Sequence, residues 1–378
     1  METDYKENFV GIMDKISCSI VENAIKGREK TKPILLIDEE PLIYPRTINV
    51  IQGKKGSHKS RLAEVLSASF IRKAPFDNLL SNVLKPLEFT RLDYSTNYKV
   101  IYIDTERDKV EQLPDSLKSI MVMSQISDIN EFRDAFTITS VLTFRRNSRV
   151  KALRDYLIKE FENVSKEEPT NYVVVLDVVS DFMLNFNDIE STYGFMDLLI
   201  EWIDQYGVTF ICTIHENPEG NKARGHLGTE ISNKASSILQ VSLHTKTNSP
   251  EYLKITCMKS RSSARFKQIH ARFNSETLGL VRLDQDETLK VKAPSNIKAS
   301  PDEIVRYLEE KLKVGTEYTK NDIFPLLEKK FNVRARTIED RIKDIIIKKS
   351  TFKFNDEPYL LTTRKENKVI KYQFTRKI

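Results

Sequence analysis

Short apolar runs rich in β-branched residues alternate with helical stretches through the middle of the chain. The runs lie at 48–52, 100–104, 136–139, 172–177 and 208–214. Ser191 to Tyr206 is one of the amphipathic stretches between them, with apolar residues at helical spacing. Continuous apolar strands separated by such helices are typical of a parallel sheet that is covered on both faces. The pattern therefore predicts an α/β domain over residues 33–291.

Four more strand-like runs follow with short gaps between them: SILQVSL, YLKITCM, FKQIHARF and LGLVRL. A parallel crossover needs about a dozen residues or more, whereas antiparallel strands are joined by short turns. We therefore expect the sheet to finish in antiparallel hairpins.

The chain begins with a polar segment, 1–32, in which apolar residues recur at near-helical spacing. They are Phe9, Ile12, Met13, Ile16, Ile20 and Ile25. This spacing predicts an amphipathic helical arm, and we expect it to pack on a neighbour.

A linker separates the α/β domain from a second domain. Residues 292–300 mix Lys, Pro, Ser and Asn without periodicity, which is typical of a linker. Within 301–378, Pro301 begins a first helix, Thr319 or Asn321 caps a second, and a third runs from Arg334 to Lys349. Two strand-like runs, YLLTT and VIKYQF, come last. Three short helices and a hairpin predict a winged helix-turn-helix, with the third helix as its recognition element.

Composition supports a globular protein and excludes several other classes. The 378 residues are 40% hydrophobic and 30% charged, and the three cysteines stand far apart, without a disulfide framework or a CxxC metal motif. The sequence contains neither an apolar run approaching the roughly 18 residues of a membrane span nor a signal-peptide pattern at its start. We therefore expect a cytoplasmic protein without membrane contact.

The net charge of +6 is concentrated at the C-terminal end. Residues 291–378 carry 21 Lys and Arg against 13 Asp and Glu, a net charge of +8, which leaves −2 for the preceding part. Two interpretations stay open: a solvated basic face, or a surface for a polyanion such as nucleic acid.

A phosphate-binding loop follows the first central strand. It consists of Gly53, Lys54, Lys55, Gly56, Ser57, His58, Lys59 and Ser60, and Arg61 follows it. The spacing matches G-x-x-x-x-G-K-[ST], except that His58 replaces the second glycine. In this pattern the loop amides cradle phosphate, Lys59 reaches the β- and γ-phosphates of ATP, and Ser60 ligates Mg²⁺. The alternative is a chance turn or a loop that no longer binds, because a side chain is costly where glycine adopts positive φ.

Two later strands end in acidic residues. The run at 100–104 ends in Asp104, which Thr105 and Glu106 follow. The run at 172–177 ends in Asp177. A carboxylate at the carboxyl end of a parallel strand is well placed to orient or deprotonate water, and a Walker B aspartate holds Mg²⁺ through water. Each residue alone could equally be a helix cap.

From about Thr47 to Phe273 these motifs, in this order, resemble the RecA-like ATPases, in particular plasmid-type replication ATPases and hexameric replicative helicases. The resemblance implies that Glu106 activates water and that His215, at the end of the last apolar strand, senses the γ-phosphate. It also implies a mobile channel-facing loop over Glu216–Glu230, in which Lys222 and Arg224 would contact DNA. Lys259 and Arg261 resemble the Lys-x-Arg pair that such helicases insert into the ATP site of a neighbouring subunit.

Our hypothesis from the sequence is an oligomeric Mg²⁺-dependent ATPase that acts on DNA in plasmid or mobile-element replication or mobilisation, with a helicase as one form. Its partners would be DNA, replication or mobilisation proteins, and further copies of itself in a ring or filament, expected to be a hexamer. In the second domain the DNA-binding residues would be Arg334, Arg336, Arg341 and Lys343. The alternatives are an ATP-dependent loader or remodeller of a partner protein, and a non-hydrolysing DNA-binding scaffold or regulator.

Overall fold

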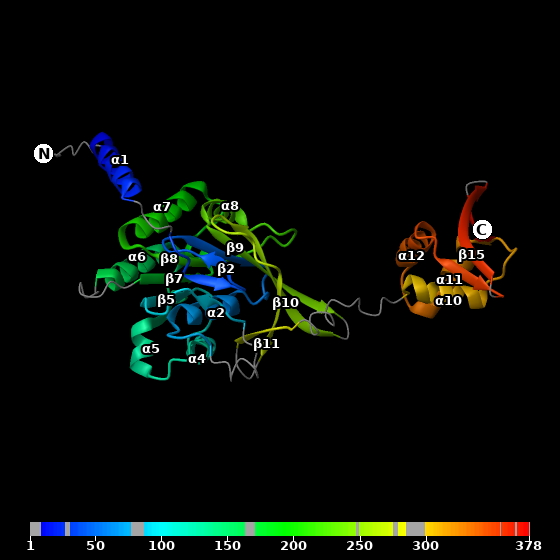
Figure 1. Cartoon of the computed structure of the whole chain (residues 1–378), viewed down its shortest axis with the longest axis horizontal. Coiled ribbons are helices and arrows are strands. Elements are labelled where there is room, and N and C mark those ends of the chain that lie inside the picture. The colour runs from blue at the N-terminus through cyan, green and yellow to red at the C-terminus, as the bar shows by residue number, and fades with distance from the viewer. Residues whose placement is uncertain are drawn as a thin grey trace. The chain divides into compact units, whose positions relative to one another are not determined.

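The computed structural model describes residues 9–26, 31–76, 87–162, 171–246, 249–274, 279–284, 299–355, 357–366 and 369–377. The chain divides into two units (Figure 1): Met1–Lys246 with Pro250–Lys290, and Val291–Ile378 with Thr247–Ser249. The predicted linker, 292–300, lies outside the described residues as far as 298.

A nine-stranded sheet forms the centre of the first unit, in the order β12-β11-β10-β9-β3-β8-β7-β5-β6. The six strands from β9 to β6 in this order pair in parallel. They are β3 (Ile48–Gly53), β5 (Tyr98–Asp104), β6 (Phe136–Ser140), β7 (Asn171–Asp177), β8 (Thr209–His215) and β9 (Ser237–Lys246). Antiparallel pairing joins β10 (Ser249–Ser260) to β11 (Ile269–Asn274) and β11 to β12 (Gly279–Arg282). The predicted α/β class and terminal hairpins are confirmed.

Helices cover both faces of this sheet, as Figure 1 shows. On one face lie α2 (Lys59–Ile71), α4 (Gln112–Ser124) and α5 (Ile129–Ala135); on the other lie α6 (Arg146–Glu162), α7 (Ile189–Tyr206) and α8 (Gly225–Lys234). Successive residues of a strand point to opposite faces, so Val100 belongs to one apolar core and Ile101 to the other. Both faces of the central strands are buried, which explains their uninterrupted apolar runs.

Several elements of this unit were not predicted from the sequence. A small antiparallel sheet has the order β2-β1-β4, with β1 (Leu35–Ile37), β2 (Glu40–Ile43) and β4 (Thr90–Arg91). A short 3₁₀ helix, η1 (Val179–Phe182), follows β7. Strands of two to four residues are too short for a periodicity to indicate them.

The N-terminal helix α1 (Phe9–Ile25) lies within the predicted arm, 1–32, of which residues 1–8 and 27–30 lie outside the described residues. None of its residues is buried, and its apolar side chains are exposed, from Ile12 at 52% to Ile25 at 80%. Among the described residues no helix is both long and apolar enough to cross a membrane.

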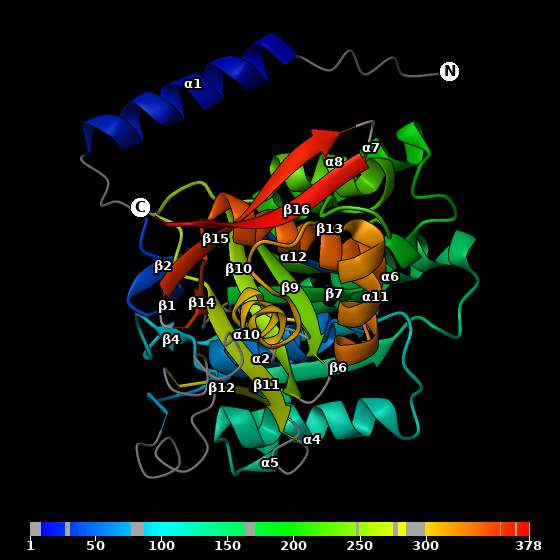
Figure 2. The same ribbon diagram turned by 90° about the vertical axis from the view of Figure 1, so that its right-hand side faces the viewer.

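The described residues of the second unit form three helices and an antiparallel sheet (Figure 1 and Figure 2, orange and red). Its helices are α10 (Pro301–Lys311), α11 (Lys320–Phe331) and α12 (Ala335–Ile347). Its sheet has the order β13-β16-β15-β14, from β13 (Tyr318–Thr319), β14 (Thr351–Phe354), β15 (Glu357–Glu366) and β16 (Val369–Arg376). Ser300 and Glu303 form a capping box ahead of α10, and Thr319 caps α11. Apolar residues of all three helices and of the sheet share one buried core.

Candidate functional site

The predicted phosphate loop connects the end of β3 to the start of α2. A Cβ at Gly53 would lie 2.4 Å from both the Ser57 Oγ and the Val241 carbonyl oxygen, so the close packing of the loop requires glycine there. Gly56 has a φ of +76°, which glycine adopts without strain. The N–H groups of the first turn of α2 have no partners within the helix, and this end of a helix favours anions.

His58 adopts the left-handed conformation, with φ 63° and ψ 30°. Outside glycine this conformation costs roughly 1–2 kcal/mol, although histidine tolerates it better than most residues. The His58 ring stacks on Phe273 of β11, with ring centroids 5.7 Å apart and an interplanar angle of 19°. Burial lowers the pKa of His58 below its usual value. Stacking thus offsets part of the strain that the departure from glycine introduces.

Lys59, His215 and Glu106 form a chain of contacts at the carboxyl ends of the parallel strands. The Lys59 Nζ donates to the Lys54 carbonyl at 3.0 Å and lies 3.1 Å from the His215 Nδ1. On the other side of the ring, the His215 Nε2 lies 3.3 Å from the Glu106 Oε1. Burial lowers the pKa of Lys59, although Asp177, Glu106 and other carboxylates oppose that shift. The hydrogen bond from His215 lowers the pKa of Glu106.

These three side chains share a cavity of about 510 Å³ with most of the loop. Its lining consists of Lys55, Gly56, Ser57, His58, Lys59, Ser60, Arg61, Glu106, Arg107, Gln112, Asp115, Ser116, Val178 and His215. A second cavity of about 710 Å³ shares Lys55, Glu106 and His215 with the first and also contains Lys54, Arg146, Phe186 and Arg224. The strand order β3-β8-β7-β5 brings the predicted loop, sensor and water-activating residue together here.

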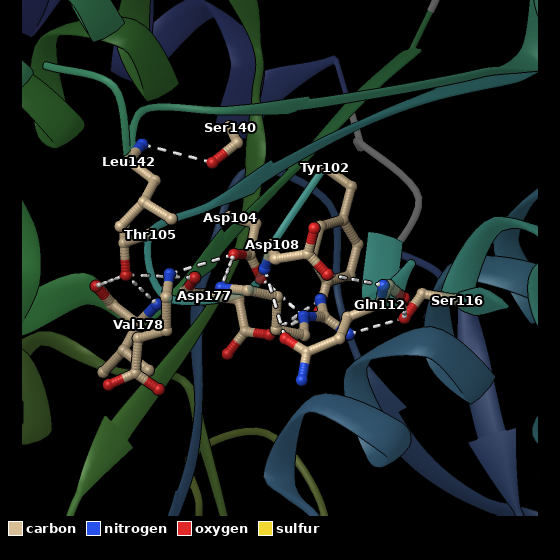
Figure 3. Close-up of polar contacts among 12 residues, drawn as sticks. Tyr102, Asp104, Thr105, Asp108, Gln112, Ser116, Ser140, Leu142, Asp177 and Val178 are labelled. Carbon is tan, nitrogen blue, oxygen red and sulfur yellow. Dashed lines mark hydrogen bonds and ion pairs between the residues drawn. The ribbon is translucent and has the colours of Figure 1, made fainter. Parts of the chain in front are cut away.

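Arg107 connects three buried carboxylates beneath the cavity, and sequence reasoning missed it. Its Nε donates to Asp104 at 2.7 Å, and its Nη1 donates to the Glu64 Oε1 at 2.6 Å. Its Nη2 donates to the Tyr102 hydroxyl at 3.0 Å and lies 3.3 Å from the Asp177 Oδ2. Figure 3 shows Tyr102, Asp104 and Asp177 gathered at these strand ends. The available sequence signal was a charged pair, Glu106-Arg107, directly after an apolar strand.

Asp177, predicted to hold Mg²⁺ through water, stands at the strand end directly beside Asp104. It is only 2% exposed, and its carboxylate accepts hydrogen bonds from Tyr102 at 2.6 Å, from Thr213 and from Arg107. It does not line either cavity described above. The structure therefore brings Asp177 close to the site but places its carboxylate in the network below.

The loop fits a nucleotide phosphate with Mg²⁺. The Ser57 Oγ is buried and has no hydrogen-bond partner within the described part of the chain, and the Ser60 side chain lines the cavity. The described residues contain no cluster of three or more His, Cys, Asp or Glu that would hold a metal alone. Such a loop suits Mg²⁺, which keeps several waters and binds through substrate phosphates.

The segment 216–230 is not a loop throughout, which corrects the prediction. Glu216 forms a β-bridge with Ala223, and α8 begins at Gly225. The α8 helix forms because Leu227 and Ile231 are buried and Gly228 packs closely against Ala223, where a Cβ would lie 2.5 Å from the carbonyl carbon. The glycine therefore serves close packing rather than mobility.

Two cations of the same segment are exposed. Lys222 lies in the turn before α8, and Arg224 lines the second cavity with its guanidinium 4.9 Å from the Phe186 ring. This arrangement leaves both charges accessible to solvent.

Lys259 and Arg261 hold the C-terminal end of α8 within their own chain. The Lys259 Nζ donates to the carbonyls of Ser232 and Asn233, at 2.7 and 3.0 Å, and Arg261 also donates to the Asn233 carbonyl. Burial and the neighbouring Arg261 lower the pKa of Lys259. Cations stabilise this end of a helix, where the carbonyls lack partners. Neither residue lines the cavities described above.

The predicted recognition helix, α12, has at its start two exposed cations without an ion pair among the described residues. Arg334 and Arg336 are exposed and form no ion pair with another described residue. In contrast, Lys343 lies 3.2 Å from Glu339, and Arg341 lies 3.7 Å from Asp344.

No protein-family model matches the sequence, and no curated protein matches it either. Among solved structures, the chain is similar to the KaiC-like protein PH0186 from Pyrococcus horikoshii OT3, with 16% identity, a TM-score of 0.42, and coverage of 68% of this chain and 99% of that one. It is also similar to the flagellar accessory protein FlaH from Methanocaldococcus jannaschii (17%, TM-score 0.40, coverage 64% and 90%). A third is the RadB recombinase (14%, TM-score 0.40, coverage 64% and 92%).

Proposed function

We propose that the chain is a RecA-like, Mg²⁺-dependent ATPase that acts on DNA as an oligomer. The observation that carries the proposal is the Lys59–His215–Glu106 chain of contacts in one cavity with the phosphate loop. Side chains from the start of α2, the end of β8 and the segment after β5 meet where a loop and a helix N-terminus favour phosphate. This combination supports phosphoryl transfer better than any other reaction class.

Each side chain has a defined task in this proposal. Lys59 would neutralise charge on the β- and γ-phosphates, and the Ser60 hydroxyl, which lines the same cavity, would hold Mg²⁺. Glu106, exposed at the cavity, accepts a proton from the attacking water, and His215 contacts the γ-phosphate. Asp177 would hold Mg²⁺ through water, and Mg²⁺ would supply charge neutralisation on the phosphates.

DNA binding is proposed for the second unit and for the turn before α8. The exposed Arg334 and Arg336 at the start of α12 support a winged helix-turn-helix, because recognition helices contact DNA with their N-terminal residues. Lys222 and Arg224 would contact a single strand near the ATP site. In this proposal the protein serves plasmid or mobile-element replication or mobilisation, as a helicase or a loader in a ring, expected to be a hexamer.

Steady-state ATP hydrolysis tests the proposal, with Lys59→Ala as the matched inactive control. We expect Mg²⁺-dependent turnover that DNA stimulates and that Lys59→Ala abolishes, because Lys59 is the buried cation of the loop. Equal turnover in the variant would remove the phosphate-loop assignment. Separation of a forked duplex would then distinguish a helicase from a loader.

A truncation tests the DNA-binding part. A variant that ends at residue 298 lacks a segment of positive net charge. We expect it to lose most of its affinity for duplex DNA and to keep its ATP turnover. Equal duplex affinity at matched salt would assign the second unit to protein docking instead.

The strained His58 favours a second candidate, a non-hydrolysing DNA-binding scaffold. Comparison of His58→Gly with His58→Ala decides it: glycine removes the left-handed strain, whereas alanine keeps the strain and loses the stacking on Phe273. The ATPase proposal predicts turnover in the wild type and the glycine variant alike. Turnover that appears only in His58→Gly would support the scaffold.

A further inference from the structure

His215 touches the phosphate-binding lysine with one ring nitrogen and the proposed base with the other. The Lys59 ammonium has donors only, so the His215 Nδ1, 3.1 Å away, must accept. We therefore assign the ring proton to Nε2, which donates to the Glu106 Oε1 at 3.3 Å. Two hydrogen bonds thus link Lys59 to His215 and His215 to Glu106. Because Lys59 donates to the Nδ1, the Nε2 carries the proton and donates to Glu106.

We propose that this contact is a latch: His215 keeps Glu106 engaged as long as Lys59 is not bound to phosphate. The Glu106 side chain is 46% exposed, and within the described part of the chain it forms its hydrogen bond with His215, so its position depends on that ring. The inference rests on the proposed function and adds a regulation of the same site.

The release follows from the contacts that Lys59 makes. Its two partners, the Lys54 carbonyl and the His215 Nδ1, are uncharged acceptors, and a phosphate oxygen forms a stronger, charge-assisted hydrogen bond. Once Lys59 turns to phosphate, the Nδ1 loses its donor and the ring is no longer held against Glu106. The base then becomes available only when the loop is loaded. His215 is thus a positioning residue for Glu106, in addition to its proposed contact with the γ-phosphate.

The first test uses the full chain without nucleotide. Long-range ¹H–¹⁵N spectra of ¹⁵N-histidine-labelled protein resolve five histidines, and His215→Gln identifies the signals of residue 215. We expect the Nε2-protonated tautomer, and in Lys59→Met we expect the Nδ1 signal to move to higher frequency because its donor is gone. His270 is the internal control for an intact fold, because it is buried on β11 and its Nε2 lies 2.7 Å from the Gln268 Nε2. An unchanged Nδ1 signal in folded Lys59→Met would overturn the latch.

The second test adds a non-hydrolysable ATP analogue with Mg²⁺, at a saturation established by titration of a fluorescent analogue. We expect the wild-type Nδ1 signal to move in the same direction as in Lys59→Met, with the His270 signals unchanged. Unchanged His215 signals at saturation would overturn the release step. Absence of analogue binding would instead refute the proposed function. The comparison of wild type with Lys59→Met, made without nucleotide, tests the contact between Lys59 and His215 independently of binding.

Discussion

At the scale of single residues, the site depends on buried charges that share partners. Glu64, Asp104 and Asp177 are at most 2% exposed, and one guanidinium, that of Arg107, contacts all three. Burial and the neighbouring Asp177 raise the pKa of Asp104, and Arg107 opposes that shift. A buried carboxylate without a partner is far more costly than an exposed one. The position of the proposed Walker B aspartate therefore depends on Arg107.

Arg107→Met tests this dependence. We expect a loss of about 3–5 kcal/mol in the free energy of unfolding, because the substitution leaves buried carboxylates unpaired. The matched control is Arg146→Met, whose partly exposed ion pair with Asp181 should be worth less than about 1 kcal/mol. Urea denaturation measures both losses in the free energy of unfolding, compared between variants whose unfolding free energy has the same slope against urea concentration. Equal losses would show that Arg107 balances no buried charge.

The pH dependence of turnover tests the contact between His215 and Glu106. Glu106 acts ionised, and the His215 hydrogen bond is the main reason for its lowered pKa, with Lys59 and Lys55 adding to it. Activity should therefore persist as the pH falls and be lost only as it passes the lowered pKa. Removal of the bond in His215→Leu raises that pKa and moves the acidic limb to higher pH.

The measurement is the acidic limb of kcat/KM against pH, which reports the free enzyme. His215→Gln is the matched variant, because its amide oxygen accepts from Lys59 and its amide nitrogen donates to Glu106. We expect its acidic limb to stay near that of the wild type. Coincident limbs in all three proteins would show that His215 does not set the pKa of Glu106.

At the scale of elements, α8 connects the cavity to the Lys259–Arg261 pair. The Arg224 N–H, just before the helix, donates to the His215 carbonyl at 2.8 Å, and carbonyls at the other end hold the pair. Gly228 allows this helix to pack against Ala223. This one short, tightly packed helix thus contacts His215 at one end and the pair at the other.

Two glycine-to-alanine substitutions in helices test this packing. Gly228→Ala should destabilise the protein by about 1–3 kcal/mol, because its Cβ would meet the backbone of Ala223 at 2.5 Å. Gly194→Ala in α7 is the control, since no atom lies within 4 Å of its Cβ position. There we expect up to about 1 kcal/mol of stabilisation from helix propensity. Thermal or urea unfolding compares them, and a neutral Gly228→Ala would mean that α8 is not tightly packed.

At the scale of the whole molecule, the proposed ring depends on two residues that line neither of the cavities described above in their own chain. Lys259 and Arg261 contact α8 in this chain, so a role in hydrolysis requires the ATP site of a neighbour. The exposed apolar side chains of α1 are a further surface without a buried contact among the described residues. In the proposed ring we expect this surface of α1 to pack on a neighbour.

Mixing two inactive variants tests this arrangement. Arg261→Ala should bind ATP but hydrolyse it slowly, by a factor of about 10³ or more, because the transition state loses a cation. Combined with Lys59→Ala, it should recover part of the activity, since some interfaces of a mixed ring pair an intact loop with an intact arginine. Hydrolysis by each variant alone and by the mixture is compared after subunit exchange has been demonstrated. No recovery would remove the trans assignment.

Local patterns in the sequence were sufficient for part of this picture. Apolar runs predicted the central strands because both faces of a parallel sheet are buried, and the spacing from Gly53 to Ser60 predicted a loop between strand and helix. Pro301 predicted where α10 begins, and Thr319, one of the two candidate caps, stands directly before α11. These features depend on a residue and its near neighbours along the chain.

Only the tertiary structure decided which side chains meet. Arg107, Glu64 and Asp177 are far apart in sequence, and their contact depends on strand order and register. The prediction of a loop over 216–230 was wrong in its second half, because burial of Leu227 and Ile231 and close packing at Gly228 stabilise a helix there. Long-range packing and shared burial of charge determine these features. Both depend on residues that are distant in the sequence, so the local sequence does not predict them.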